Sequence, residues 1–176
     1  MKTIKVKNTR NIDVGGKPSD SLVQKTQLTS VAVSPSLYPY IRPKLLVKVG
    51  DSVKIGTPLF FDKQDEKLVF VSPMSGVIQD IIYGERRVIK NIVIEAKGEE
   101  YEAGIAMSEG DLSSSTANSL RETIVKQGLW SGFRQFPFLN IPKTSVELPS
   151  SIYISLDEDE PHYPKASIFL KGNEEY

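Results

Sequence analysis

The fold of this 176-residue chain is decided by the stretch Leu45–Glu95, LLVKVGDSVKIGTPLFFDKQDEKLVFVSPMSGVIQDIIYGERRVIKNIVIE. Apolar and polar residues alternate in Val47–Val49, and β-branched residues dominate throughout, which predicts a row of short β-strands. Glycine enters left-handed backbone conformations without a Cβ clash and so favours turns between such strands. Turns are predicted at Gly50-Asp51, Gly56, Ser75-Gly76 and Gly84-Glu85. Strands this short and this dense indicate a small barrel or sandwich rather than a parallel sheet.

The stretch contains two related halves. The first runs from Gly50 to Leu59 and begins G-D-S-V, and the second runs from Ser72 to Ile81 and begins S-P-x-S-G-V. This arrangement resembles the barrel-sandwich hybrid of biotinyl and lipoyl domains, in which two such motifs flank a hairpin. In carrier domains of that type the hairpin bears the lysine that is covalently modified.

The expected carrier position holds an acid in this chain. Counting from either motif, the lysine position falls on Asp65 or Glu66, while Lys63 and Lys67 lie nearby but out of register. We therefore expect the scaffold without the swinging arm, with the two lysines at a solvated hairpin tip.

The composition excludes several kinds of site. The chain has no cysteine, which removes disulfides, cysteine zinc sites and protein-ligated Fe–S clusters, and its only histidine is His162. Lys plus Arg and Asp plus Glu both number 22, so no overall charge favours nucleic acid or a membrane surface. The longest apolar runs are too short to span a membrane, and the N-terminus lacks the apolar core of a signal peptide. We expect a soluble, cytoplasmic protein.

Catalytic motifs are missing as well. No G-x-G-x-x-G occurs, Pro73 replaces the first glycine of a nucleophile elbow, and Pro18 follows Lys17 where a Walker motif needs Ser or Thr. The acidic run at 157–160 lacks calcium-loop spacing. We predict no catalytic residue and no metal ligand in this chain.

The remainder of the chain predicts mixed structure. Strands are expected at 3–7 and 29–34. A helix near 114–127 is indicated by the serines at its start, by the apolar face of Leu120, Ile124 and Val125, and by Gly128 as its C-cap. Further strands are expected near 151–155, as a buried strand, and near 166–170. The fold class is therefore α+β: a barrel-sandwich hybrid at 1–97, then the start of an incomplete α/β domain at 98–176.

One segment after the helix is unusually aromatic and contains the single tryptophan. One interpretation is a loop packed on the helix. The other is a surface for a flat ring or a partner, with the arginine as its polar anchor. The residues concerned are Trp130, Phe133, Arg134, Phe136 and Phe138.

Several motifs in sequence order resemble the N-terminal part of the A subunit of the sodium-translocating NADH:quinone reductases. The matching segments are Ile4–Lys7, Asn11–Pro18, Arg42–Lys63, Val69–Ile78, Gly84–Arg87, Gly128–Phe138 and Lys171–Glu175. The resemblance covers nearly the whole chain.

The resemblance implies a function and a location. Members of that family are longer, so it implies that this chain is part of a longer protein. It implies a peripheral subunit on the cytoplasmic side of the bacterial inner membrane that contacts the membrane only through partner subunits and is linked to quinone. It further implies that NAD, FAD, FMN, the Fe–S centre and quinone belong to the complex, with no cofactor in this chain. The chain alone is then expected to lack NADH:quinone reductase activity.

Three alternatives remain open at this point, and one of them is a free-standing scaffold protein derived from the subunit. The C subunit of the Rnf electron-transport complex shares the barrel-sandwich start, and a lipoyl- or biotinyl-type carrier domain shares the scaffold. The mass of the intact protein distinguishes the carrier, because a lipoyl or biotinyl group on Lys63 or Lys67 adds mass.

Overall fold

The computed structural model describes residues 15–16, 19, 28–154, 163 and 168. The chain divides into two compact units, one made of residues 1–26 with 150–176 and one made of residues 27–149. Most described residues belong to the second unit, so the fold is that of residues 27–149. Three features of the sequence lie outside the described residues: the strand predicted at 3–7, His162 and the acidic run at 157–160.

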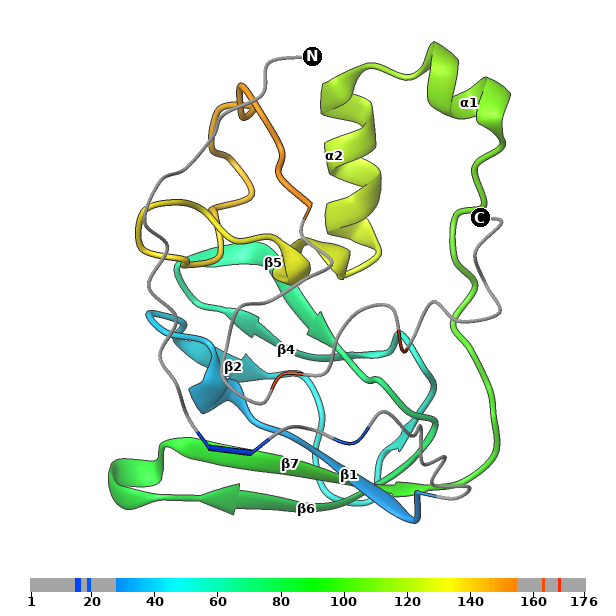
Figure 1. The fold of residues 1–176 in the computed structure, drawn as a ribbon. Coiled ribbons are helices and arrows are strands. Elements are labelled where there is room, and N and C mark those ends of the chain that lie inside the picture. The colour runs from blue at the N-terminus through cyan, green and yellow to red at the C-terminus, as the bar shows by residue number, and fades with distance from the viewer. Residues whose placement is uncertain (1–14, 17–18, 20–27, 155–162, 164–167, 169–176) are drawn as a thin grey trace. The chain divides into compact units, whose positions relative to one another are not determined.

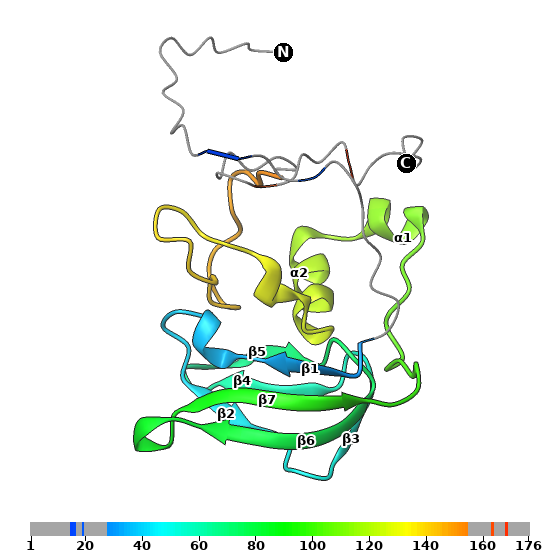
Figure 2. The ribbon, with the colours of Figure 1, turned by 60° about the horizontal axis from the view of Figure 1, so that its bottom comes forward.

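Two antiparallel sheets form this unit (Figures 1 and 2). The first sheet contains, in spatial order, β1 (Ser30–Val33), β7 (Ile89–Ala96), β6 (Gly76–Tyr83) and β3 (Ser52–Val53). The second contains β2 (Pro43–Leu45), β4 (Pro58–Asp62) and β5 (Asp65–Val71). Figure 1 shows β4 and β5 above the β6–β7 hairpin. The strand within 29–34 and most of the predicted strands between Leu45 and Glu95 are confirmed, but the alternating residues Val47–Val49 lie between β2 and β3 and form no strand.

The core combines side chains from both sheets. Along β7, Ile89, Ile92 and Ile94 are buried while Lys90 and Glu95 are exposed, which is the alternation that gives a strand one apolar face. In the second sheet, Phe60 of β4 stacks on Phe70 of β5 with ring centroids 4.5 Å apart. The buried apolar residues of the strands are Val53, Leu59, Phe60, Leu68, Phe70, Ile78, Ile81, Ile89, Ile92 and Ile94. Burial of each such large side chain stabilises the fold by roughly 1.5–3 kcal/mol.

Glycine is required in the turns and at the start of β6 for two different reasons. Gly50 and Gly56 have φ of 91° and 96°, a region that L side chains rarely adopt. Gly76 is required by close approach, because a Cβ there would lie 1.8 Å from the carbonyl oxygen of Glu95 on β7. The turns predicted at Gly50 and Gly56 are confirmed, whereas Gly76 is the first residue of strand β6.

Two helices replace the one predicted near 114–127. α1 (Glu109–Ser114) and α2 (Ala117–Lys126) are separated by Ser115 and Thr116, which have extended backbone. Each helix has its own N-cap: Ser108 forms a capping box with Asp111, and the Thr116 side chain accepts a hydrogen bond from Ser119 N. The prediction of a helix is right for α2. It missed the break, which arises because serine hydroxyls bond to backbone carbonyls of α1 and compete with helix continuation.

The caps also have an electrostatic consequence. The Ser108 hydroxyl, and secondarily the Ser108 N–H, donate to the carboxylate of Asp111. These hydrogen bonds favour the charged form and hold the pKa of Asp111 below its usual range. A carboxylate in the first turn of a helix also complements the helix dipole.

The end of α2 predicted at Gly128 is present one residue beyond its C-cap Gln127, and two of the three residues of the predicted apolar face pack against the core. Gly128 follows the helix with a left-handed φ of 72°, and Ile124 and Val125 pack against the core. A Cβ at Gly128 would lie 2.4 Å from a methyl of Val71, so this glycine also lets the helix end approach β5 closely. Figure 1 shows α2 over β5.

The strand predicted near 151–155 is wrong for its described residues. Residues 151–154 have no strand pairing, and Ile152, Tyr153 and Ile154 are exposed. A segment of alternating apolar residues forms a buried strand only when the edge of a neighbouring strand supplies hydrogen bonds and other residues cover its apolar face. No described residue does so for residues 151–154. The strand predicted near 166–170 lies outside the described residues except for Ile168, which is helical.

Candidate functional site

The β4–β5 turn contains the position that the resemblance to carrier domains assigns to a modified lysine. Asp62 is buried and accepts hydrogen bonds from the backbone N–H of Arg42 (3.0 Å) and of Gln64 (3.2 Å). Asp65 accepts from the backbone N–H and the hydroxyl of Thr144, at 2.6 and 2.7 Å. The acids of this turn therefore hold structure together. Lys63 and Lys67 are exposed beside them.

A single strip of chain, residues 141–146, takes part in three such contacts. In addition to the Asp65–Thr144 pair, Trp130 Nε1 donates to Pro142 O at 2.8 Å and Arg121 Nη1 donates to Val146 O at 2.7 Å. Ile141 and Thr144 are buried. The β4–β5 turn, α2 and the aromatic segment therefore all form hydrogen bonds with residues 141–146. The placement of this strip depends on all three parts of the unit being folded.

The Asp65–Thr144 contact is expected to stabilise the fold substantially. Asp65→Ala removes two charge-assisted hydrogen bonds and leaves the buried Thr144 N–H without its acceptor. We expect a loss of about 2–3 kcal/mol in the free energy of unfolding, measured by urea denaturation. Glu66→Ala is the matched control, because Glu66 is the exposed neighbouring acid, and should change stability by less than about 0.5 kcal/mol. Equal effects of the two substitutions would refute a structural role for Asp65.

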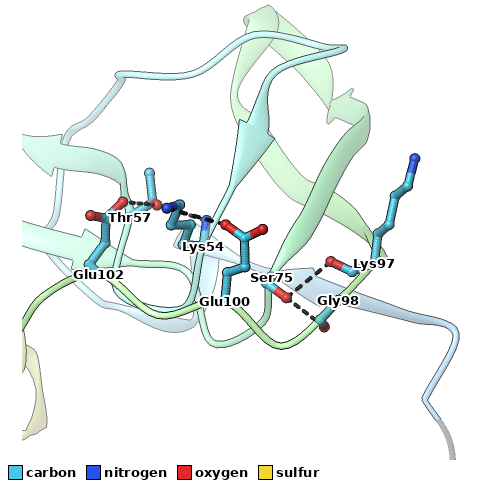
Figure 3. Close-up of polar contacts among 7 residues, drawn as sticks. All are labelled: Lys54, Thr57, Ser75, Lys97, Gly98, Glu100 and Glu102. Carbon is cyan, nitrogen blue, oxygen red and sulfur yellow. Dashed lines mark hydrogen bonds and ion pairs between the residues drawn. The ribbon is translucent and has the colours of Figure 1, made fainter.

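The chain that leaves the barrel is attached to its edge (Figure 3). Ser75, which is buried, donates its hydroxyl to the carbonyls of Lys97 (3.1 Å) and Gly98 (2.6 Å). Further on, Thr57 Oγ1 donates to Glu102 at 2.7 Å, and Lys54 forms an ion pair with Glu100 at 3.2 Å.

Backbone contacts strengthen this attachment. Ile55 N donates to Glu100 O, and Glu102 N donates to Ile55 O, at 2.9 and 2.8 Å. These two bonds form a parallel bridge centred on Ile55 and Tyr101. The connection from β7 toward α1 is therefore fixed along residues 97–102, and the ion pair, being exposed, contributes little beside the backbone bonds.

The predicted aromatic site divides into two parts. Trp130 lies in a 3₁₀ helix, η3 (Leu129–Gly132), and belongs to the core with 7% of its surface exposed. Its ring centroid is 5.1 Å from that of Phe133, which packs against the same core. These two residues fit the interpretation of a loop packed on the helix.

The other part is an exposed loop. Gln135 N donates to Asn140 O at 2.8 Å, which closes residues 136–139 into a tight loop. Phe136 and Phe138 are 73% and 78% exposed, and Leu139 adds a third exposed apolar side chain. We call Phe136, Phe138 and Leu139 the apolar loop. The sequence pattern missed Leu139, since a leucine beside prolines and phenylalanines carries no signal of exposure.

Arg134 is turned onto its own backbone. Its Nη1 donates to Ser131 O at 2.6 Å and to Phe133 O at 2.9 Å. These hydrogen bonds fix the guanidinium at the start of the apolar loop. Its other N–H groups remain available to donate to a ligand. The structure brings Arg134 next to the loop but separates both from the buried indole of Trp130. The assignment of the five residues to a ligand or partner surface stays a prediction.

Metal and membrane features are limited in the described part of the chain. No group of three or more His, Cys, Asp or Glu residues there could hold a metal ion. No helix among the described residues is long and apolar enough to cross a bilayer.

Comparison with known proteins identifies the family. Residues 4–97 match the family model described as "NqrA N-terminal barrel-sandwich hybrid domain", and residues 115–176 match the "NqrA second alpha/beta domain". The barrel-sandwich fold predicted for the first part, followed by α/β structure, is therefore confirmed.

Named relatives agree with this assignment. The chain is 35% identical to the A subunit of the Na(+)-translocating NADH-quinone reductase of Glaesserella parasuis and 34% identical to that of Cellvibrio japonicus, over 90% of this chain in each case. It is 31% identical over 96% of its length to the corresponding protein of Neisseria meningitidis. The chain spans only 35–37% of the length of these relatives. The chain belongs to the NqrA family, whose named members are the A subunits of Na(+)-translocating NADH-quinone reductases.

Proposed function

We propose that this chain is the N-terminal portion of a peripheral, cofactor-free subunit of a sodium-pumping NADH:quinone oxidoreductase, where it contributes to assembly and to quinone association. The family match over both halves of the chain carries this proposal. NAD, FAD, FMN and the Fe–S centre are assigned to the other subunits. The proposed location is the cytoplasmic face of the bacterial inner membrane, with membrane contact through those partners.

In this proposal the barrel holds the neighbouring segments of the chain in place. Asp65 of its hairpin holds the 141–146 strip through Thr144, and its edge holds the 97–102 connection, so the apolar loop is presented from a fixed base. A rigid base lowers the entropic cost of binding a flat ligand or a partner. The chain itself performs no bond chemistry in this proposal.

Quinone association is assigned to the apolar loop, with Arg134 beside it as hydrogen-bond donor to a quinone carbonyl. Two exposed phenyl rings, Phe136 and Phe138, supply the apolar faces on which a quinone ring can stack. Trp130 and Phe133 support the loop from the core side and do not touch the ligand.

The test is binding of ubiquinone-1 to the purified chain. Replacing both Phe136 and Phe138 by serine should weaken binding about tenfold or more, because each aromatic contact contributes roughly 0.5–1.5 kcal/mol. Isothermal titration calorimetry measures the dissociation constant. The control is Tyr101→Ser with Leu112→Ser, which removes two other exposed apolar side chains and should leave binding unchanged.

Two results would contradict the assignment. Ubiquinone-1 binding that survives in the Phe136/Phe138 variant places the quinone elsewhere, and binding lost equally in the control variant is unspecific adsorption. A lipoyl or biotinyl adduct on Lys63 or Lys67, seen in the intact mass, would instead support the carrier interpretation.

A further inference from the structure

The turn of the β6–β7 hairpin carries a cluster of cations. Arg86 and Arg87 lie in a 3₁₀ turn, η2 (Glu85–Arg87), and Lys90 follows in β7. All three side chains are exposed. The single ion pair among the described residues is Lys54–Glu100, so Arg86, Arg87 and Lys90 have no carboxylate partner among those residues. We call residues 83–90 the basic tip. Glu85 is its one acid, so its net charge is positive.

The turn holds the charges close together. A Cβ on Gly84 would lie 2.6 Å from Lys90 Cε, so the lysine stem crosses directly over this glycine. Gly84 N donates to Val88 O at 2.7 Å and Val88 N donates to Glu85 O at 3.1 Å, which closes the turn. Both views of the ribbon show this end of the hairpin projecting past β4 and β5 (Figures 1 and 2).

The backbone of the tip is unfavourable for the residues that occupy it. Arg86 has φ 52° and ψ 29°, and Arg87 has φ 59°, so two consecutive non-glycine residues are left-handed. Hairpin turns of this kind strongly favour Asn-Gly, which adopts such angles at little cost. The two arginines are therefore poor choices for the turn itself. Residues held in sparsely populated conformations point to a role for their side chains.

The residues around Arg86 and Arg87 indicate what kind of surface the two arginine side chains contact. Tyr83 and Val88 flank the arginines and are 47% and 56% exposed, so the cations are bordered by apolar surface. Arg and Tyr are among the residues most enriched at the centres of protein interfaces. A guanidinium also presents paired N–H donors that match a carboxylate. A lipid surface is recognised by clusters of about four to eight basic residues, more than the tip contains.

We propose that the basic tip docks on an acidic protein surface, one that places carboxylates opposite Arg86 and Arg87 beside a small apolar patch. This contact is separate from the apolar loop and goes beyond quinone association. It does not depend on the quinone assignment.

The test uses the isotope-labelled 176-residue chain titrated with poly-L-glutamate at low salt, followed by amide chemical shifts. Shifts should concentrate in residues 83–90. Arg86→Asn with Arg87→Gly keeps the turn geometry and removes both charges. It should weaken binding at least tenfold while the midpoint of thermal unfolding stays the same or rises. Arg86→Gln with Arg87→Gln removes the same charges without changing backbone preference and should weaken binding equally.

The matched control is Lys48→Gln with Lys67→Gln, which removes two other exposed charges and should change binding less than twofold. Equal weakening in the control, or no binding by the parent chain, overturns the proposal. Binding to vesicles of phosphatidylcholine and phosphatidylglycerol that is tighter than binding to poly-L-glutamate, and that is lost when both arginines are replaced, also overturns it in favour of a lipid surface. A lowered unfolding midpoint in the Arg86→Asn, Arg87→Gly variant would show that the arginines serve the turn, which contradicts the proposal.

Discussion

Trp130→Ala is expected to lower the free energy of unfolding by about 3–5 kcal/mol, which is the usual cost of deleting a buried tryptophan. The indole is 7% exposed, packs on Phe133 and donates from Nε1 to Pro142 O. Alanine would leave a cavity under η3 and remove the contact that holds the 141–146 strip. Urea denaturation followed by circular dichroism measures the change, since the variant lacks the only tryptophan.

Two further variants separate packing from hydrogen bonding and from ligand contact. Trp130→Phe keeps most of the packing and loses the Nε1 donor, so a smaller loss of stability is expected than for alanine. Phe138→Ala removes a similarly large aromatic that is 78% exposed and should change stability by less than about 0.5 kcal/mol. If Trp130→Ala left stability intact but abolished ubiquinone-1 binding, the indole would be a ligand contact and our division of the aromatic segment would be wrong.

Gly76→Ala is expected to be at least as damaging, with a loss of about 4 kcal/mol or failure to fold. The added methyl would lie 1.8 Å from Glu95 O and 2.9 Å from Glu95 C. Both atoms are backbone, so no side chain can move aside, and β6 and β7 would have to separate where Gly76 pairs with Ala96. Clashes of this kind belong to the few mechanisms that give very large effects.

Substitutions at two other glycines serve as controls for Gly76→Ala. Gly50 has φ 91° with open space around it, so Gly50→Ala tests the backbone conformation alone and should cost about 1–2 kcal/mol. Gly132 has neither restriction, and Gly132→Ala should be nearly neutral. The measurement is the midpoint of urea unfolding, read from Trp130 fluorescence. A Gly76→Ala variant as stable as Gly50→Ala would show that the hairpin relaxes and that close approach is not the reason for this glycine.

The strands were predictable because their signals are local. Alternation of β-branched residues and glycine turns are properties of a few neighbouring residues, and the described structure reproduces most of them from Pro43 to Ala96, although Val47–Val49 forms no strand. The helix boundaries were less accessible, since the hydroxyls of Ser113–Ser115 compete with the backbone in a way that composition does not reveal. At 151–154 the local pattern failed, because a strand needs a partner edge that residues 151–154 cannot specify by themselves.

The candidate site was predictable only as a segment. The sequence singled out five residues between Trp130 and Phe138, and aromatic character alone could not tell the buried indole from the exposed Phe136 and Phe138. Likewise the sequence placed the carrier position at Asp65 or Glu66, but it could not show that Asp65 pairs with Thr144, which lies 79 residues away. No local pattern connects two such positions.

By itself, the sequence determined the strand-rich barrel, its glycine turns, the absence of cysteine chemistry and the family resemblance, because each depends on residue types and short spacings. The tertiary structure alone decided which aromatic side chains face the core and which face outward, that Asp65 binds the 141–146 strip, and that Arg86 and Arg87 adopt a left-handed backbone. The physical reason is that burial and hydrogen-bond partnership depend on how distant segments pack, and packing is settled by the whole chain at once.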